Sequence, residues 1–88
     1  MQVIWDESPG ENVDHLAEHG ITPAEAEDVL LDDRIKTAFS NSSGSPCKFG
    51  ETSTGKYIIV IWIEVDDNPR TIYPVTAYEV PRPARWKI

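Results

Sequence analysis

The feature that most constrains this fold is an apolar run at residues 56–65 (KYIIVIWIEV). The run is rich in β-branched and aromatic residues, which favour strands over helices. It is also nearly continuous, which is typical of a strand that is buried on both faces. Its length is far below the roughly 20 residues that a membrane-spanning helix needs. The run therefore predicts the central strand of a sheet.

Turn signals on both sides of this run predict neighbouring strands. Residues 66–69 (DDNP) close a hairpin, and residues 70–79 (RTIYPVTAYE) form the returning strand. Pro74 cannot donate a backbone hydrogen bond, so we expect this strand to have an open side or a bulge there. Ser53-Thr54-Gly55 is the turn on the other side. Shorter strands are expected at residues 34–39 and 47–52, separated by a loop at 40–46.

The first third of the chain carries helix signals instead. After a short strand at residues 2–5, the segment Ser8-Pro9-Gly10-Glu11 predicts a helix over residues 9–19. In this interpretation Ser8 caps the helix, Pro9 takes its first position and Glu11 completes a capping box. Gly20 stands where a left-handed C-terminal cap belongs. The expected buried stripe consists of Val13, Leu16 and Ala17.

A second helix is predicted over residues 23–31 by the start signal Thr22-Pro23-Ala24-Glu25. Its apolar face consists of Ala26, Val29 and Leu30. The order of elements is therefore strand, helix, helix and then three or four strands. This order predicts an α+β fold in which a helical hairpin packs on one face of an antiparallel sheet. We expect a single domain over residues 1–88.

Charge is distributed unevenly along the chain. Residues 1–33 contain ten acidic side chains and no Lys or Arg, whereas residues 34–88 contain eight Lys or Arg and five acidic side chains. The net charge of −7 is unusual for a nucleic-acid-binding protein. The C-terminal excess of positive charge could nevertheless present a basic face to a phosphate backbone.

Cysteine usage and the N-terminal residues bear on the cellular compartment. Cys47 is the only cysteine, so no intrachain disulfide forms, and it is expected to be a small strand residue. The first ten residues lack the features of a signal peptide. A cytoplasmic location with no membrane association is therefore expected. Because small domains without disulfides often gain stability from association, homo-oligomerisation is a further expectation.

Several short motifs follow one another along the chain: Trp5-Asp6-Glu7, Asn12, His19-Gly20-Ile21, Glu25-Ala26, Gly50-x-Thr52, Gly55-Lys56-Tyr57 and Thr76-Ala77. In order and spacing these motifs resemble the BrnT family. BrnT proteins are toxins of type II toxin–antitoxin systems with a RelE-like fold. The resemblance implies a metal-independent ribonuclease without a cofactor, with RNA as its substrate and a cognate antitoxin as its partner.

The chain departs from this family where its nuclease residues normally lie. The family has a Ser-Ala step where this chain has Thr76-Ala77, followed by a basic position that is occupied here by Tyr78-Glu79. Two prolines interrupt the segment that is an Arg-rich helix in the family. The family's nuclease residues therefore do not transfer to these positions. The basic residues that remain are Arg82, Arg85 and Lys87.

Chemistry in the last strand and tail supplies the candidate site residues. A metal-independent ribonuclease needs a cation for the pentavalent phosphate and groups that move protons. Arg suits the first role, and aromatic side chains stack on bases. The catalytic candidates are Arg70, Tyr78 and Arg82, and the candidates for RNA or partner binding are Lys56, Arg85 and Trp86.

Structural alternatives accompany these assignments. Period-two alternation places Tyr73 and Tyr78 on opposite faces unless Pro74 introduces a bulge, and either tyrosine can be a half-buried sheet residue with its hydroxyl at the rim. His15 and His19 share a helix face, but without an organised third ligand no metal site is predicted. His19 is instead expected to cap its helix, and Trp5 and Trp62 are expected in the core.

Two function classes remain open at this point. The first is an RNA-cleaving toxin of the BrnT/RelE type, for which endoribonuclease is the candidate activity. The second is a non-catalytic RelE-like interaction module that has lost its basic nuclease site. A basic concave face would favour the first class, whereas a neutral, hydrophobic or self-associating face would favour the second.

Overall fold

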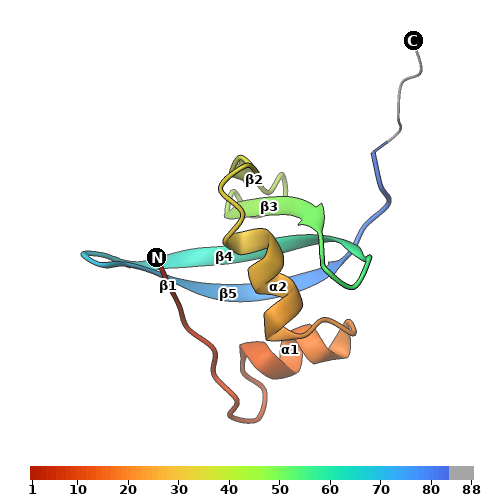
Figure 1. Cartoon of the computed structure of the whole chain (residues 1–88). Helices are drawn as coiled ribbons and strands as arrows, with labels where there is room; N and C mark the ends of the chain where they lie inside the picture. The colour runs from red at the N-terminus through yellow and green to blue at the C-terminus, as the bar shows by residue number, and fades with distance from the viewer. Residues whose placement is uncertain (84–88) are drawn as a thin grey trace.

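The computed structural model describes residues 1–83 and confirms the α+β class, with a five-stranded mixed sheet and two helices (Figure 1). Arg85 and Trp86 lie outside the described residues. None of the helices in residues 1–83 is long and apolar enough to cross a membrane. The elements are β1 (Gln2–Val3), α1 (Asn12–Glu18), α2 (Pro23–Leu30), β2 (Ala38–Phe39), β3 (Pro46–Glu51), β4 (Tyr57–Asp67) and β5 (Arg70–Glu79).

The sheet has the strand order β1-β5-β4-β3-β2, so β4 is central as predicted. The pairs that join β2, β3, β4 and β5 are antiparallel. β1 instead pairs in parallel with β5, with Gln2 opposite Thr71 and Val3 opposite Ile72. The prediction of a wholly antiparallel sheet is therefore wrong at this edge. The chain between β1 and β5 runs through both helices and three strands, and such a long connection permits the parallel pairing, which a tight hairpin would not.

The second helix begins as predicted. The backbone N–H of Glu25 donates to Thr22 Oγ1 at 3.1 Å, and the N–H of Thr22 donates to Glu25 Oε1 at 3.0 Å. This reciprocal pair is a complete capping box. It fixes the start of α2 at Pro23, the first helical position, where a missing N–H costs nothing.

The first helix begins later than predicted, at Asn12. Its N-cap is Glu11, which makes no side-chain capping bond, so the proposed cap at Ser8 and the capping box are wrong. Gly10 has a φ of +80°, which interrupts a helix, and its N–H donates to the Asp14 carboxylate at 2.9 Å. The segment before Asn12 is therefore a turn. The predicted left-handed conformation of Gly20 is confirmed by its φ of +75°.

Two predicted strands are shorter than expected. β1 ends at Val3 instead of residue 5, and the strand expected at 34–39 is reduced to Ala38–Phe39. Asp32 explains the second difference, because its carboxylate accepts bonds from both the backbone N–H and the guanidinium of Arg34. These bonds hold residues 32–34 in a turn, where extended pairing is excluded.

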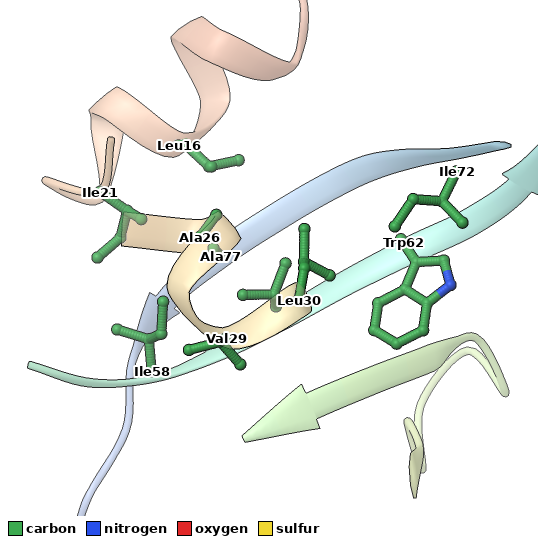
Figure 2. Close-up of a cluster of buried hydrophobic side chains, with 10 residues drawn as sticks. Leu16, Ile21, Ala26, Val29, Leu30, Ile58, Trp62, Ile72 and Ala77 are labelled. Carbon is green, nitrogen blue, oxygen red and sulfur yellow. The ribbon is translucent and has the colours of Figure 1, made fainter. Parts of the chain in front are cut away.

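The hydrophobic core lies between the helices and one face of the sheet (Figure 2). Trp62 is 1% exposed within this core, and Trp5 packs against it as expected. Ala17 is exposed, so its place in the predicted stripe is wrong. Buried Asn12 occupies the first turn of α1 instead, where its side-chain amide donates to the carbonyl of Ile4 at 2.8 Å. The cluster consists of Leu16, Ile21, Ala26, Val29, Leu30, Ile58, Val60, Trp62, Ile72 and Ala77.

Of the two alternatives predicted at Pro74, an open side or a bulge, the structure has the bulge. Ile61 pairs with Thr76 and Trp62 pairs with Pro74, so Val75 is an extra residue in β5. The bulge shifts the alternation of the strand by one position. As a result, Tyr73 pairs with Ile63 and Tyr78 pairs with Ile59, so both tyrosines belong to the same face of the sheet.

Candidate functional site

The structure divides the three proposed catalytic residues between two ends of the sheet. Arg70 begins β5 at the hairpin, whereas Tyr78 lies near the other end of that strand and Arg82 follows it. At a rise of about 3.3 Å per residue, Arg70 and Tyr78 are about 26 Å apart along the strand. A single phosphate therefore cannot contact both side chains.

Near that end of β5, Tyr78 and Arg82 each contact a ring that the sequence did not single out for this site. The guanidinium of Arg82 lies over the ring of Tyr57, 5.8 Å from its centroid. The ring of Tyr78 contacts that of His19, with their centroids 5.6 Å apart. The backbone N–H of Val80 donates to the carbonyl of Tyr57, which joins the two strands here. We refer to His19, Tyr57, Tyr78 and Arg82 as the corner cluster.

Arg82 is held in place within the corner cluster by an ion pair. Its Nη2 donates to Glu51 Oε2 at 3.0 Å and to the carbonyl of Gly55 at 2.8 Å. The hydrogen bond to Glu51 raises the pKa of this guanidinium. A phosphate would have to compete with the carboxylate of Glu51 for this cation.

Lys56 points to the opposite side of the sheet and connects the hairpin turn to α2. Its Nζ donates to the carbonyl of Gly20 at 2.7 Å and lies 3.1 Å from Glu25 Oε2. Glu25 is 5% exposed and also accepts hydrogen bonds from the hydroxyl of Thr54 and the N–H of Thr22. The bond from Thr54, followed by the bond from Thr22, lowers the pKa of Glu25 to about 2. Lys56 therefore stabilises the fold in this position.

Arg70 is likewise engaged by a carboxylate. Its guanidinium makes two bonds to Glu64, at 3.2 and 2.9 Å, and Glu64 also accepts from the indole N–H of Trp62. Because Trp62 belongs to the core, this pair lies on the helix side of the sheet. Much of the positive charge that the sequence offered to a phosphate is thus neutralised within the chain.

The histidines take the positions of a cap and a surface residue. The backbone N–H of His19 donates to the carbonyl of Leu16 at the end of α1, but its ring contacts Tyr78 instead of the helix carbonyls. His15 is exposed on the same helix. Within residues 1–83, no group of three or more His, Cys, Asp or Glu side chains is arranged to hold a metal ion.

The second candidate site is the helix-free face of the sheet, which the strand register defines. Ile58, Val60 and Trp62 of β4 point into the core, so the alternate residues of this strand point the other way. Their partners on β3 and β5 share that orientation. The helix-free face consists of Cys47, Phe49, Glu51, Tyr57, Ile59, Ile61, Ile63, Tyr73, Thr76 and Tyr78.

This face is apolar and partly open to solvent. Phe49 is 41% exposed, Ile63 is 47% exposed, and Val65, beside a second register shift, is 53% exposed. Glu51 is the one charged side chain among the residues of the face, and it lies at the end that Arg82 covers. The sequence predicted burial of β4 on both faces. The structure buries the helix side, whereas on the helix-free side it buries Ile59, which is 6% exposed, and leaves Ile63 open to solvent. The sequence pattern of β4 could not reveal this difference, because the residues that face the helices and those that face away from them are both apolar.

Comparisons with known proteins give no further assignment, since no protein-family model, curated protein or solved structure matches this chain.

Proposed function

We propose that this chain is a RelE/BrnT-like interaction module that binds a protein partner on the helix-free face of its sheet. The observation that carries the proposal is the exposure of Phe49, Ile63 and Val65 on or beside one nearly uncharged face. A one-layer antiparallel sheet normally turns polar residues toward solvent. Large exposed apolar patches mark interaction sites on most folded proteins.

The toxin–antitoxin resemblance supplies the expected partner, a cognate antitoxin. In such a pair the chain would act by association, whether or not it also cleaves RNA. The loss of the family's basic tail and the ion pairing of Arg70 and Arg82 both favour association over catalysis.

A metal-independent ribonuclease is the second candidate function, favoured by the corner cluster. His19 is a group suited to proton transfer, Arg82 is suited to a phosphate, and Tyr57 and Tyr78 are suited to stacking on bases. Cleavage at this site would require Arg82 to exchange Glu51 for a phosphate oxygen.

Co-purification with the product of the adjacent gene tests the proposed function. The tagged chain is compared with the variants Ile63→Lys, on the helix-free face, and Leu31→Lys, at the end of α2. Both residues are about half exposed, so both variants should fold. We expect only Ile63→Lys to lose the partner. Equal retention or equal loss in the two variants would exclude the helix-free face as the binding surface.

Induced expression in a bacterial host separates the two candidate functions. Growth and bulk RNA integrity are followed together for the parent chain and for Arg82→Ala. Slowed growth with RNA cleavage that requires Arg82 would support the ribonuclease. Intact RNA and unchanged growth would leave association as the function.

A further inference from the structure

The margin of the helix-free face is acidic, and this identifies the chemistry of its partner. We infer that the partner segment is a single amphipathic helix with an apolar stripe and Lys or Arg on its flanks. This inference rests on the proposed function and specifies the ligand of the same face.

The dimensions of the face suit one helix. Strands β3, β4 and β5 span about 10–15 Å at a spacing of about 4.8 Å, which matches the diameter of about 10–12 Å of a helix with its side chains. From Ile59 to Val65 the face is about 20 Å long. A helix of about 14 residues covers that length.

Acidic groups lie at the hairpin end and along the β5 edge of the face. Asp66 and Asp67 are exposed at the hairpin. Glu11, at the start of α1, reaches the β5 edge, where the hydroxyl of Tyr73 donates to its carboxylate at 2.8 Å. Cations on the flanks of a bound helix would meet these carboxylates, which favours association and fixes its orientation.

Basic groups on this side are few among residues 1–83. Lys48, Lys56 and Arg70 are bonded on the helix side of the sheet. Arg82 reaches the helix-free side, but it is paired there with Glu51. Arg34 pairs with Asp32, and Lys36 is exposed ahead of β2, at the sheet edge opposite β5. The acidic groups at the hairpin and the β5 edge therefore favour a basic ligand.

A second copy of the chain is the less suitable occupant. A two-fold interface places the same patch on both sides, and each copy carries a net charge of −7. The hairpin acids of one copy would then meet either the same acids or the neutral Arg82–Glu51 end of the other. Neither arrangement offsets their repulsion.

Titration of the full-length chain with designed helical peptides tests the inference. The probes are a 14-residue Leu/Lys amphipathic peptide and a Leu/Glu peptide of the same pattern. Methyl NMR shifts report where each peptide binds. We expect the Leu/Lys peptide to shift Ile59, Ile61, Ile63 and Val65 while leaving Leu16 and Leu31 unchanged, and we expect no binding of the Leu/Glu peptide.

Charge-neutral variants show whether the acidic margin matters. Asp66→Asn with Asp67→Asn preserves the oxygens that accept hydrogen bonds in the turn. Glu18→Gln with Asp33→Asn removes the same charge from exposed positions in the helical part. At low salt we expect the first pair of substitutions to weaken binding of the Leu/Lys peptide by about three- to tenfold. The second pair should have little effect on this affinity. Equal weakening by both pairs would overturn the inference.

Other outcomes separate this inference from the proposed function. Binding of the Leu/Glu peptide to the face, or concentration-dependent dimerisation through it, would overturn the basic-helix inference and leave an interaction module in place. Shifts confined to the helical part would overturn the inference in the same way. If neither peptide nor a second copy perturbs the face methyls, both proposals fail.

Discussion

The two faces of the sheet are built from the same strands but have different relations to solvent. On β4, Val60 and Trp62 are at most 1% exposed beneath the helices, whereas Ile63 on the other face is 47% exposed. Both sets are equally apolar, so composition does not separate them. The separation arises because α1 and α2 cover one side.

The contrast assigns different roles to neighbouring residues. Side chains under the helices determine stability, because they leave water completely on folding. On the helix-free face Ile59 is only 6% exposed, whereas Ile63 and Val65 are about half exposed. The exposed residues contribute less to stability and are available to a partner. Variants of buried and exposed residues test this division, and the expected effects on stability decrease from the first variant to the last.

Trp62→Ala should have the largest effect. Loss of a fully buried indole removes its transfer free energy and leaves a cavity, at a cost of about 3–5 kcal/mol. Ile63→Ala, one residue away on the other face, should cost less than about 1 kcal/mol. Urea denaturation measures both. Similar losses in the two variants would show that the faces are equally covered in solution.

Lys48→Met should be the next most destabilising change. The buried ammonium of Lys48 donates to the carbonyls of Leu30 and Asp32 at 3.0 and 3.1 Å, which satisfies the end of α2. Met fills similar volume but donates nothing, so we expect a loss of about 1–3 kcal/mol in chemical denaturation. Exposed Lys36→Met is the matched control and should be neutral.

Gly50→Ala should destabilise the helix side of β3 by about 1 kcal/mol. A Cβ at Gly50 would lie 2.6 Å from Ile35 Cδ1 and 3.3 Å from both γ-carbons of Val29. Ile35 and Val29 would have to shift to avoid this overpacking. Thermal unfolding should show a lower midpoint, and Phe49→Ala on the opposite face should change it less. An unchanged midpoint for Gly50→Ala would indicate that α2 packs loosely against β3 at Gly50.

Glu25→Gln should remove part of the pH dependence of stability. The pKa of Glu25 falls from its usual 4.5 to about 2 on folding, so the unfolded chain binds its proton more readily. The resulting stabilisation is fully present above about pH 4.5 and is lost as the pH falls toward 2. Glu25→Gln should therefore lose less stability than the parent between pH 4.5 and 2. Urea denaturation at several pH values across this range measures the free energy of unfolding. The same dependence of this free energy on pH in parent and variant would contradict the lowered pKa of Glu25.

Ile63→Lys should have the smallest effect on folding. An exposed position away from caps and turns usually shifts stability by no more than about 0.5 kcal/mol, and the Lys stem can still cover its neighbours. Calorimetry should show a nearly unchanged midpoint for this variant, even though we expect it to lose the proposed partner. Substantial unfolding would mean that the helix-free face also supports the fold.

Local signals in the sequence predicted much of this architecture. The capping box at Thr22 and Glu25, the central strand and the bulge at Pro74 all follow from nearby residues. The start of α1 was misplaced because Gly10 adopts a positive φ, which the favourable pattern at Ser8 and Glu11 obscured. The parallel pairing of β1 depends on residues at the far end of the chain, so no local pattern could report it.

The candidate site was less predictable, for a physical reason. Arg70, Tyr78 and Arg82 are close in sequence, but an extended strand separates its ends by a large distance. The carboxylates that neutralise the two arginines, Glu64 on β4 and Glu51 on β3, come from other strands, so they can be identified only once the register of the sheet is known. His19, at the end of α1, is predicted from the sequence only as a helix cap. Its contact with Tyr78 depends on how α1 packs against β5.

The pairing of Gln2 with Thr71 has a consequence for how the chain folds. During synthesis the first strand leaves the ribosome long before its partner, and it cannot join the sheet until β5 has been made. Contacts between such distant parts of a chain slow folding, because a large loop must close before they form. The β4–β5 hairpin and α2 contain mostly local contacts and should form first. β1 should be protected last in pulsed hydrogen exchange during refolding.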